Sequence, residues 1–273
     1  RLTTLVSAAR GSVRRSKTWA VGRIGPDLAF DWYQRTTEMR GTLAARRREA
    51  ECIEAARAQL ARLPEARVVT VIPTYQRPEL LRRAVASAQA QTVVDHAIVV
   101  VNDGGSLPEL RTDERLACIT LPVNVGIAGV VRNVGIALSR SEYLAFLDDD
   151  NEWRPNHLYL CLGGFRPGVD LVYSAVMRVR PDGTELDVIS WPFDRSQLRR
   201  QRSVDTSSIV VRRGRGATFS RVPRNSKSLE DWELVWRFSR RHGVLHVPEV
   251  TVRYLVNPET YYSRWSPDDL AGK

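Results

Sequence analysis

Three consecutive aspartates, Asp148, Asp149 and Asp150, have the clearest chemical meaning in the sequence. They follow the apolar run Tyr143–Leu147, which has the composition of a buried strand. Neighbouring carboxylates at a strand end raise one another's pKa unless a cation neutralises them. Hard oxygen ligands in small number suit Mg²⁺ or Mn²⁺, which take water and phosphate oxygens as further ligands. The run therefore predicts a metal–diphosphate site, since an acidic helix cap would explain one aspartate but not three.

Polar residues also follow three other apolar runs. They are Pro73, Thr74, Tyr75 and Arg77 after Val68–Ile72, Asp103 after Ala97–Val101, and Asn124 after Ala117–Leu121. Ligands of open α/β sheets bind beyond the carboxyl ends of the strands. If these strands are parallel, all four loops meet at one edge of the sheet, and their polar side chains form one binding site.

A second acidic feature lies far downstream, at Glu230 and Asp231. Ser228 can cap a helix that begins here, and acidic residues suit the first turn of a helix. The same position also stabilises an ionised carboxylate, which is usable as a general base when it faces a cleft. The structural and the catalytic interpretations can hold together.

Motifs of other enzyme classes do not occur in the sequence. Without Gly-x-Gly-x-x-Gly or Gly-x-x-x-x-Gly-Lys-Ser/Thr, a Rossmann dinucleotide site and a P-loop are disfavoured. Without Gly-x-Ser-x-Gly or His-Glu-x-x-His, serine hydrolases and zinc proteases are disfavoured as well. The segment Arg212–Gly216 is short and lacks aromatic residues, so we interpret it as a flexible loop near an anionic substrate rather than a nucleic-acid-binding segment.

The order of elements predicts an α/β fold. Between Val68 and Leu147, β-branched runs alternate with helical segments at Pro78–Gln91 and Gly126–Ser139 and a short helical piece near Leu107–Arg111. This order indicates right-handed crossovers and a mostly parallel sheet covered on both faces. Beyond Pro167 we expect a mixed α+β extension of the same sheet, with strands at Asp170–Val179, Leu186–Ser190 and Ser207–Val211 and a helix at Ser228–Arg241.

The first part of the chain predicts a basic lead-in over residues 1–25, followed by an amphipathic helix from Asp27 to Leu63. We interpret the arginines 46–48 of this helix as a solvated face. Its apolar stripe is expected to pack on the main domain or a second subunit, and contact with a membrane stays open. The expected divisions are residues 1–66, a first half of the sheet domain at 67–166, a second half at 167–258 and a tail at 259–273.

Composition sets broader limits. The chain has 273 residues, of which 43% are hydrophobic and 26% charged, as in soluble globular proteins. No apolar run reaches the length of a membrane-spanning helix. The net charge of +10 indicates an anionic partner, or only the Arg-rich composition of a GC-rich genome. The three widely spaced cysteines suggest reduced thiols and a cytoplasmic protein.

Five segments, in this order, resemble the signatures of the family 2 glycosyltransferases, the large inverting group with the GT-A fold. They are Val69–Tyr75, Val100–Gly104, Asn124–Gly126 with Val131–Gly135, Phe146–Asp150, and Glu230–Trp232. The fold that the resemblance implies is a GT-A type, mostly parallel twisted sheet flanked by helices, with a mixed acceptor half and an N-terminal helical extension. The part of the chain before Arg67 is not covered.

The resemblance implies a role for each matching residue on the donor side. Thr74 and Tyr75 would line the nucleoside pocket, and Asp103 would accept a hydrogen bond from the base. Arg132 would lie near the base or the diphosphate. The full set expected to contact the donor is Pro73, Thr74, Tyr75, Arg77, Asp103, Asn124, Arg132, Asp148 and Asp149.

For the metal and the acceptor, the resemblance implies that Asp150 ligates Mn²⁺ or Mg²⁺ while Asp148 faces the ribose or the metal and its water. Asp231 would deprotonate the acceptor hydroxyl. The sequence departs from the family pattern at Asn151 and Asn102, where many relatives carry aspartate. The later aspartate of each motif is kept, but the register of the acidic run stays ambiguous.

Together these features predict a metal-dependent inverting glycosyltransferase that uses a nucleotide-diphosphate sugar, with UDP or dTDP as the nucleotide. The expected acceptor is a glycan, a lipid-linked or a small molecule, and no nucleic acid is expected as a partner. A cytoplasmic location is expected, with peripheral contact at the inner face of the membrane and a homo-oligomer left open. The alternatives are a retaining transferase, a sugar nucleotidyltransferase, or a non-catalytic nucleotide-sugar-binding scaffold.

Overall fold

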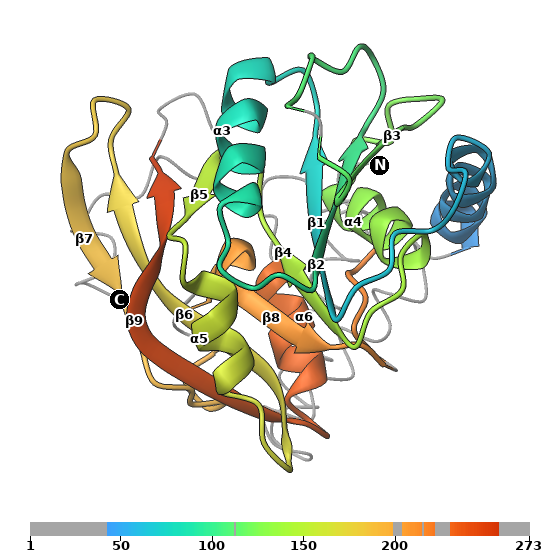
Figure 1. Cartoon of the computed structure of the whole chain (residues 1–273). Coiled ribbons are helices and arrows are strands. Elements are labelled where there is room, and N and C mark those ends of the chain that lie inside the picture. Colours follow the sequence, from blue (N-terminus) through green and yellow to red (C-terminus); the bar gives the residue numbers. More distant parts are fainter. Residues whose placement is uncertain (1–42, 112, 199–203, 215, 222–229, 257–273) are drawn as a thin grey trace, which may run out of the picture.

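The computed structural model describes residues 43–111, 113–198, 204–214, 216–221 and 230–256. Within these residues, nine strands form one sheet (Figure 1). The strands are β1 Val68–Thr74, β2 His96–Asn102, β3 Leu116–Thr120, β4 Tyr143–Phe146, β5 Asn151–Trp153, β6 Val169–Val179, β7 Glu185–Ile189, β8 Ile209–Arg212 and β9 Gly243–Leu255. Their spatial order is β3-β2-β1-β4-β8-β6-β9-β5, and β7 pairs with β6.

The strand directions decide which loops meet. Strands β1 to β4 are parallel to one another, as the sequence predicts. Strand β8 is antiparallel to both β4 and β6, and β9 is parallel to β6. The carboxyl ends of β4, β6 and β9 and the amino end of β8 therefore lie at the same edge of the sheet. The second half of the chain extends the same sheet, as expected.

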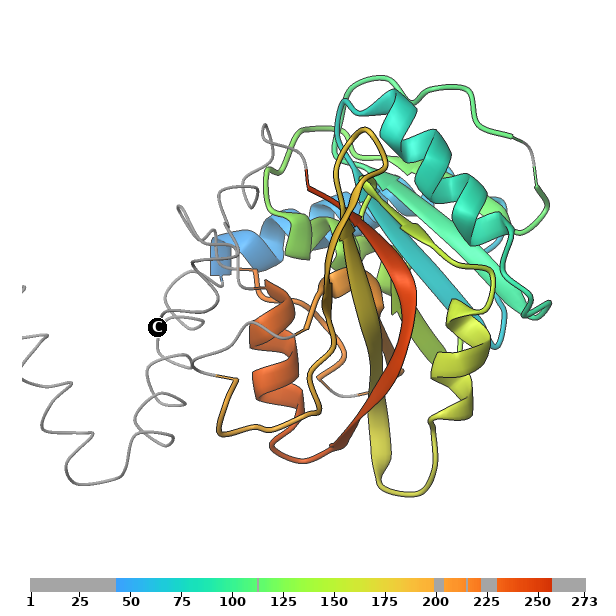
Figure 2. The same cartoon turned by 90° about the vertical axis from the view of Figure 1, so that its left-hand side faces the viewer.

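Helices cover both faces of the sheet (Figure 2). Helices α3 (Pro78–Gln89) and α5 (His157–Gly163) lie on one face. Helices α4 (Ala128–Ala137) and α6 (Glu230–Phe238) lie on the other, with a helix over residues 43–57. Alternate residues of β1 enter the two cores, which explains why its sequence is apolar without interruption.

Two glycines let helix α4 approach its neighbours unusually closely. A Cβ atom on Gly135 would lie 2.5 Å from Cγ1 of Val71 in β1, and one on Gly129 would lie 2.3 Å from the carbonyl oxygen of Ser220. Real Cβ atoms do not make contacts this short, so a larger residue at either site would push the helix away. Gly135 thus allows close packing of the carboxyl-terminal part of α4 on β1, and Gly129 allows close packing of its amino end on Ser220.

The helix at 43–57 packs on the main domain, one of the two expected arrangements. Cys52 and Ala56 are buried in the core beside α4 and α6. Gln59 extends the contact, because its amide donates to Thr120 O at 2.7 Å and accepts from Thr120 N at 2.9 Å. The predicted helical residues 27–42 lie outside the described part. Cysteines 52, 118 and 161 are all free, in agreement with the predicted reduced thiols.

Several expectations about local structure were wrong. Residues 107–111 form no helix, because five residues with a proline are too short to nucleate one without tertiary support. Strands β5 and β9 were not predicted from the sequence. Strand β9 was not predicted because Pro248 interrupts its run of strand-forming residues. The pairing of β9 with β6 shifts register around that residue.

The expectation that the Arg212–Gly216 segment lies near an anionic substrate was wrong for its first two residues. Arg212 pairs with Tyr143 at the start of β4, so it lies at the edge opposite the acidic loop, and its guanidinium contacts Glu142 at 2.7 Å. Arg213 donates to the carbonyl of Ile136 and to Ser139 Oγ, each at 2.9 Å. It therefore caps the carboxyl end of α4. Arg215 lies outside the described residues.

Candidate active site

The loops after the parallel strands converge at one edge, as predicted. Thr74 at the end of β1 donates a hydrogen bond of 2.7 Å to Asp149, after β4. Asp103, after β2, accepts from the backbone N–H groups of Val125 at 2.7 Å and Gly126 at 2.8 Å. The backbone N–H of Asp103 also donates to the carbonyl oxygen of Thr74 at 2.8 Å, which connects the two pairs of loops. These contacts therefore hold all four loops relative to one another.

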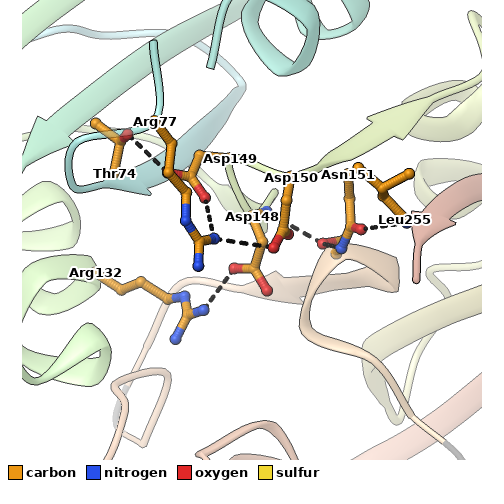
Figure 3. Close-up of polar contacts among 9 residues, drawn as sticks. Thr74, Arg77, Arg132, Asp148, Asp149, Asp150, Asn151 and Leu255 are labelled. Carbon is orange, nitrogen blue, oxygen red and sulfur yellow. Dashed lines mark hydrogen bonds and ion pairs between the residues drawn. The ribbon is translucent and has the colours of Figure 1, made fainter. Parts of the chain in front are cut away.

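Asp149, one of the residues expected to contact the donor, has an inward-facing and largely buried side chain. Its side chain is 7% exposed and is held by Thr74 and by Nη1 of Arg77 at 3.1 Å (Figure 3). The same Nη1 contacts Asp150 at 3.0 Å. Burial raises the pKa of Asp149, while the charge of Arg77 and the hydrogen bond from Thr74 oppose that shift. As placed here, Asp149 anchors the loop and leaves its two neighbours to face the site.

Asp148 is bound by Arg132 of α4, whose Nη2 lies 2.5 Å from its carboxylate (Figure 3). The Arg132 side chain is buried, and its guanidinium carbon lies 4.9 Å from the centre of the Phe219 ring. A guanidinium that is stacked and buried is held in one orientation. The predicted donor-side arginine and the first aspartate of the run are therefore one structural unit.

Asp150 carries the most perturbed pKa in the acidic loop. Burial raises its pKa to about 7, and the charges of Asp148 and Asp149 add to this effect against the opposing charge of Arg77. Its side chain nevertheless retains some exposure toward the site. A carboxylate in this state gains much from a nearby cation, which would stabilise its ionised form.

Two side chains that the sequence analysis did not assign to the site join this cluster. Burial raises the pKa of Asp205 well above its usual range, and the charges of Asp148, Asp231 and Asp150 contribute. Tyr254 has its pKa raised by burial and by these same four carboxylates. The acidic loop, Asp231 and Asp205 therefore lie within electrostatic range of one hydroxyl group.

Asp205 was missed for a topological reason. The search for polar residues after strands applies to parallel strands, whereas Asp205 comes before the antiparallel β8. The amino end of an antiparallel strand lies at the same edge as the carboxyl ends of its parallel neighbours. Tyr254 belongs to β9 and would have been found by that search had the strand been predicted.

Asp231 lies in the first turn of α6, half-buried, and accepts a hydrogen bond from the backbone of Trp232 at 2.6 Å. The positive end of the helix dipole favours its ionised form. The predicted cap Ser228 lies outside the described residues. Elsewhere at the edge, Tyr75 is 42% exposed, Asn124 is also exposed and Pro73 is half-buried, so these three can be reached by a ligand.

Residues 69–223 match the model of a protein family described as glycosyl transferase family 2. The chain belongs to this family. Among curated relatives of this glycosyltransferase, the succinoglycan biosynthesis protein ExoW of Rhizobium meliloti is 37% identical over 102 residues, covering 34% of this chain and 32% of ExoW. The chondroitin synthase of Pasteurella multocida is 32% identical over 138 residues, covering 46% of this chain and 14% of the synthase. The matched regions thus span a third or less of these relatives.

Solved structures show that this transferase has the GT-A fold. Staphylococcus aureus TarS 1–349 in complex with UDP-GlcNAc superposes with a TM-score of 0.56 at 15% identity, covering 73% of this chain and 61% of TarS. The mannosyltransferase PcManGT of Pyrobaculum calidifontis, in complex with GDP-Man and Mn²⁺, gives 0.52 at 14% identity, covering 83% of this chain and 70% of PcManGT.

The donor set of the transferase fits a divalent cation that has other ligands as well. Among the described residues, no three histidine, cysteine or acidic side chains are arranged to hold a metal by themselves. Asp148 and Asp150 offer hard oxygen atoms, and Mg²⁺ is usually bound by one or two carboxylates together with water and phosphate. The crowded negative charge around Asp150 is the feature that such a cation would relieve.

Within the described ranges, no helix of the transferase is long and apolar enough to cross a bilayer.

Proposed function

We propose that this glycosyltransferase moves a sugar from a nucleotide-diphosphate sugar to an acceptor hydroxyl, with inversion at the anomeric carbon and with a divalent cation. UDP or dTDP is the proposed nucleotide. The observation that carries the proposal is that Asp148, Asp150 and Asp231 all raise the pKa of Tyr254, whose backbone pairs with Asn151 directly after the acidic loop. A site for leaving-group charge and a candidate base are then within reach of one substrate.

On the donor side, the exposed ring of Tyr75 is proposed to stack on the nucleoside, and the carboxylate of Asp103 is proposed to accept a hydrogen bond from its base. Each oxygen of Asp103 already accepts one backbone N–H, which fixes its orientation and leaves further lone pairs. The UDP-GlcNAc complex of TarS supports a nucleotide sugar as donor.

At the diphosphate, Asp150 and Asp148 would hold Mn²⁺ or Mg²⁺. When bound there, the cation would neutralise the negative charge that develops on the departing diphosphate. Arg132 and Arg77 already contact these two aspartates, and both guanidinium groups can donate further hydrogen bonds to phosphate oxygens. The Mn²⁺ complex of PcManGT supports this assignment.

On the acceptor side, Asp231 is proposed to take the proton of the attacking hydroxyl. Inversion requires the base on the face of the sugar opposite the leaving group, and the base here comes from a different element, α6, than the acidic loop. The helix dipole keeps the carboxylate ionised and therefore able to accept a proton. The similarity to ExoW, a succinoglycan biosynthesis protein, supports a glycan acceptor.

The proposal is tested by the release of nucleoside diphosphate from a panel of nucleotide sugars in the presence of Mn²⁺. Asp150→Ala and Asp231→Ala should each abolish release while the fold is kept, and Asp170→Ala, at the opposite edge, should retain it. The anomeric configuration of the product separates inversion from retention, and pyrophosphate release would indicate a nucleotidyltransferase. Unchanged turnover in both active-site variants would overturn the assignment.

A further inference from the structure

Ser207 is a fully buried residue that contacts the acidic loop directly. It lies in the 3-10 turn Thr206–Ser208 immediately before β8. Its Oγ accepts the backbone N–H of Asp148 at 3.1 Å and the side-chain amide of Asn151 at 2.8 Å. One hydroxyl oxygen therefore holds the first residue of the acidic loop and the residue that follows the loop.

Asn151 carries the connection to a second strand. Its side-chain oxygen accepts the backbone N–H of Leu255 at the end of β9, at 3.1 Å, while its amide nitrogen donates to Ser207 (Figure 3). An amide donates and accepts at once, whereas an aspartate here would have no hydrogen to donate and would add a charge to the loop. The asparagine at position 151, where the family pattern has aspartate, thus allows one side chain to link Ser207 to β9.

Ser207 is itself held in place. Its backbone N–H donates to Asp205 at 2.8 Å, and its carbonyl oxygen accepts the indole N–H of Trp153 at 2.6 Å. These contacts place the hydroxyl in a rigid turn rather than on a mobile loop. A group with fixed surroundings can resist the movement of its partners.

We propose that Ser207 is a positioning residue, which together with Asn151 clamps the loop 148–150 so that its carboxylates stay close together in the absence of a cation. The carboxylates of neighbouring residues in the loop carry like charges and repel one another, so the loop would open without a restraint on its backbone. The role in transfer rests on the proposed function, whereas the clamp itself does not.

The chain offers a matched control for the test. Ser208 is the next residue, equally buried, but its hydroxyl donates to the carbonyl of Asp205 at 2.7 Å and has no recorded bond to the acidic loop. Ser207→Ala and Ser208→Ala therefore remove the same atom from the same turn. Any difference between them reports the contact with the loop.

Hydrogen–deuterium exchange of the full chain tests the clamp independently of activity. In Ser207→Ala, exchange in a peptide that contains Asp148 should increase on the order of tenfold, because the backbone N–H of Asp148 loses the Ser207 hydroxyl as its acceptor. In Ser208→Ala, exchange in the same peptide should stay at the wild-type rate. Equal exchange in the two variants would overturn the clamp. If Ser207→Ala does not fold, Ser207→Cys, which keeps the size of the side chain but offers only a weak acceptor to the Asp148 N–H, is compared with Ser208→Cys by the same criterion.

The consequence for function is tested by titrating Mn²⁺ into each variant with UDP and by measuring release from the donor that the wild type accepts. Ser207→Ala should need several-fold more Mn²⁺ for half-maximal UDP binding, and its kcat should fall on the order of tenfold or more. Ser208→Ala should keep the wild-type values of both quantities. Equal values for the two variants would overturn the positioning role. A wild type that binds no nucleotide with Mn²⁺ would instead contradict the proposed function, and the exchange result would still stand.

Discussion

The hydroxyl of Thr74 donates a 2.7 Å hydrogen bond to the buried carboxylate of Asp149 and so ties the end of β1 to the acidic loop after β4. The donor is neutral. Within the described part of the chain, the ion-pair partner of Asp149 is Arg77, which Asp149 shares with Asp150. A buried carboxylate depends strongly on each of its few partners. This contact therefore supports both the fold and the arrangement of the site.

Replacing Thr74 with valine should lower the free energy of unfolding by about 1–3 kcal/mol, because the shape is retained and one hydrogen bond to a buried charge is lost. Urea denaturation at pH 7.5 measures the effect. Thr120→Val is the control, since the Thr120 side chain forms no hydrogen bond with the described residues and its backbone pairing with Gln59 is unaffected. Equal losses in the two variants would show that the Asp149 contact contributes nothing specific.

Two buried histidines predict that the protein is labile to acid. Burial lowers the pKa of His96 to about 4 and that of His157 to about 3. Both are neutral in the fold, whereas the unfolded chain takes up their protons below about pH 6.5. Stability is therefore lost as the pH falls from about 6.5 toward those values, by about 1.4 kcal/mol per pH unit for each histidine.

Urea denaturation between pH 7.5 and pH 4.5 measures this slope. The double variant His96→Gln, His157→Asn keeps a hydrogen-bonding atom for Thr70 and for Thr251, and its stability should depend less on pH. A double variant as acid-sensitive as the wild type would contradict the prediction.

Sequence reasoning succeeded where a pattern is local. Apolar runs predict the strands β1, β2 and β4, and helical spacing predicts the helices α3 and α4. The alternation of these elements indicates parallel strands, which places Thr74, Asp103 and the acidic loop at the same edge of the sheet. Asp149 shows the limit of this reasoning. Three consecutive aspartates have the same local sequence character, so the sequence does not indicate which side chain turns inward. The answer depends on Thr74 and Arg77, which lie beside Asp149 in the fold.

The second half of the site depends on contacts that no local pattern encodes. Asp205 and Ser207 lie at the same sheet edge as the acidic loop because β8 is antiparallel to β4. Tyr254 belongs to β9, whose strand pattern is interrupted by Pro248. Similarly, Glu49 belongs to a helix that precedes the family match, yet it is buried. Its partners become visible only once the helix at 43–57 is docked.

Glu49 should anchor this helix. Its carboxylate accepts from Asn133 of α4 at 2.9 Å and from Arg221 at 2.6 Å. Glu49→Ala should lower the free energy of unfolding by about 1–3 kcal/mol, because Arg221 loses its partner in a largely buried place. Chemical denaturation checks this, with the exposed Glu54→Ala of the same helix as control. Glu49→Gln should be intermediate, and a loss no larger than that of Glu54→Ala would argue against anchoring.

The acidic loop should weaken the fold when no cation is bound. Because the pKa of Asp150 is raised to about 7, the unfolded chain loses this proton first, and stability falls as the pH rises from about 4 to about 7. In EDTA at pH 8, Asp150→Asn should be more stable than the wild type by roughly 1–4 kcal/mol, with little difference at pH 4. Guanidinium denaturation at both pH values measures this, and Asp182→Asn, in an exposed turn, should show no such gain. A less stable Asp150→Asn at pH 8 would contradict the account.

The central claim is tested most directly by comparing donor binding with product release in Asp231→Asn. With Mn²⁺ and the nucleotide sugar that the wild type uses, this variant should bind the donor within about twofold of the wild type, because the asparagine keeps the shape and only the base is lost. Its rate of transfer to the acceptor should fall on the order of 100-fold or more. Transfer at the wild-type rate would contradict the assignment of Asp231 as the base and, with it, the proposed mechanism.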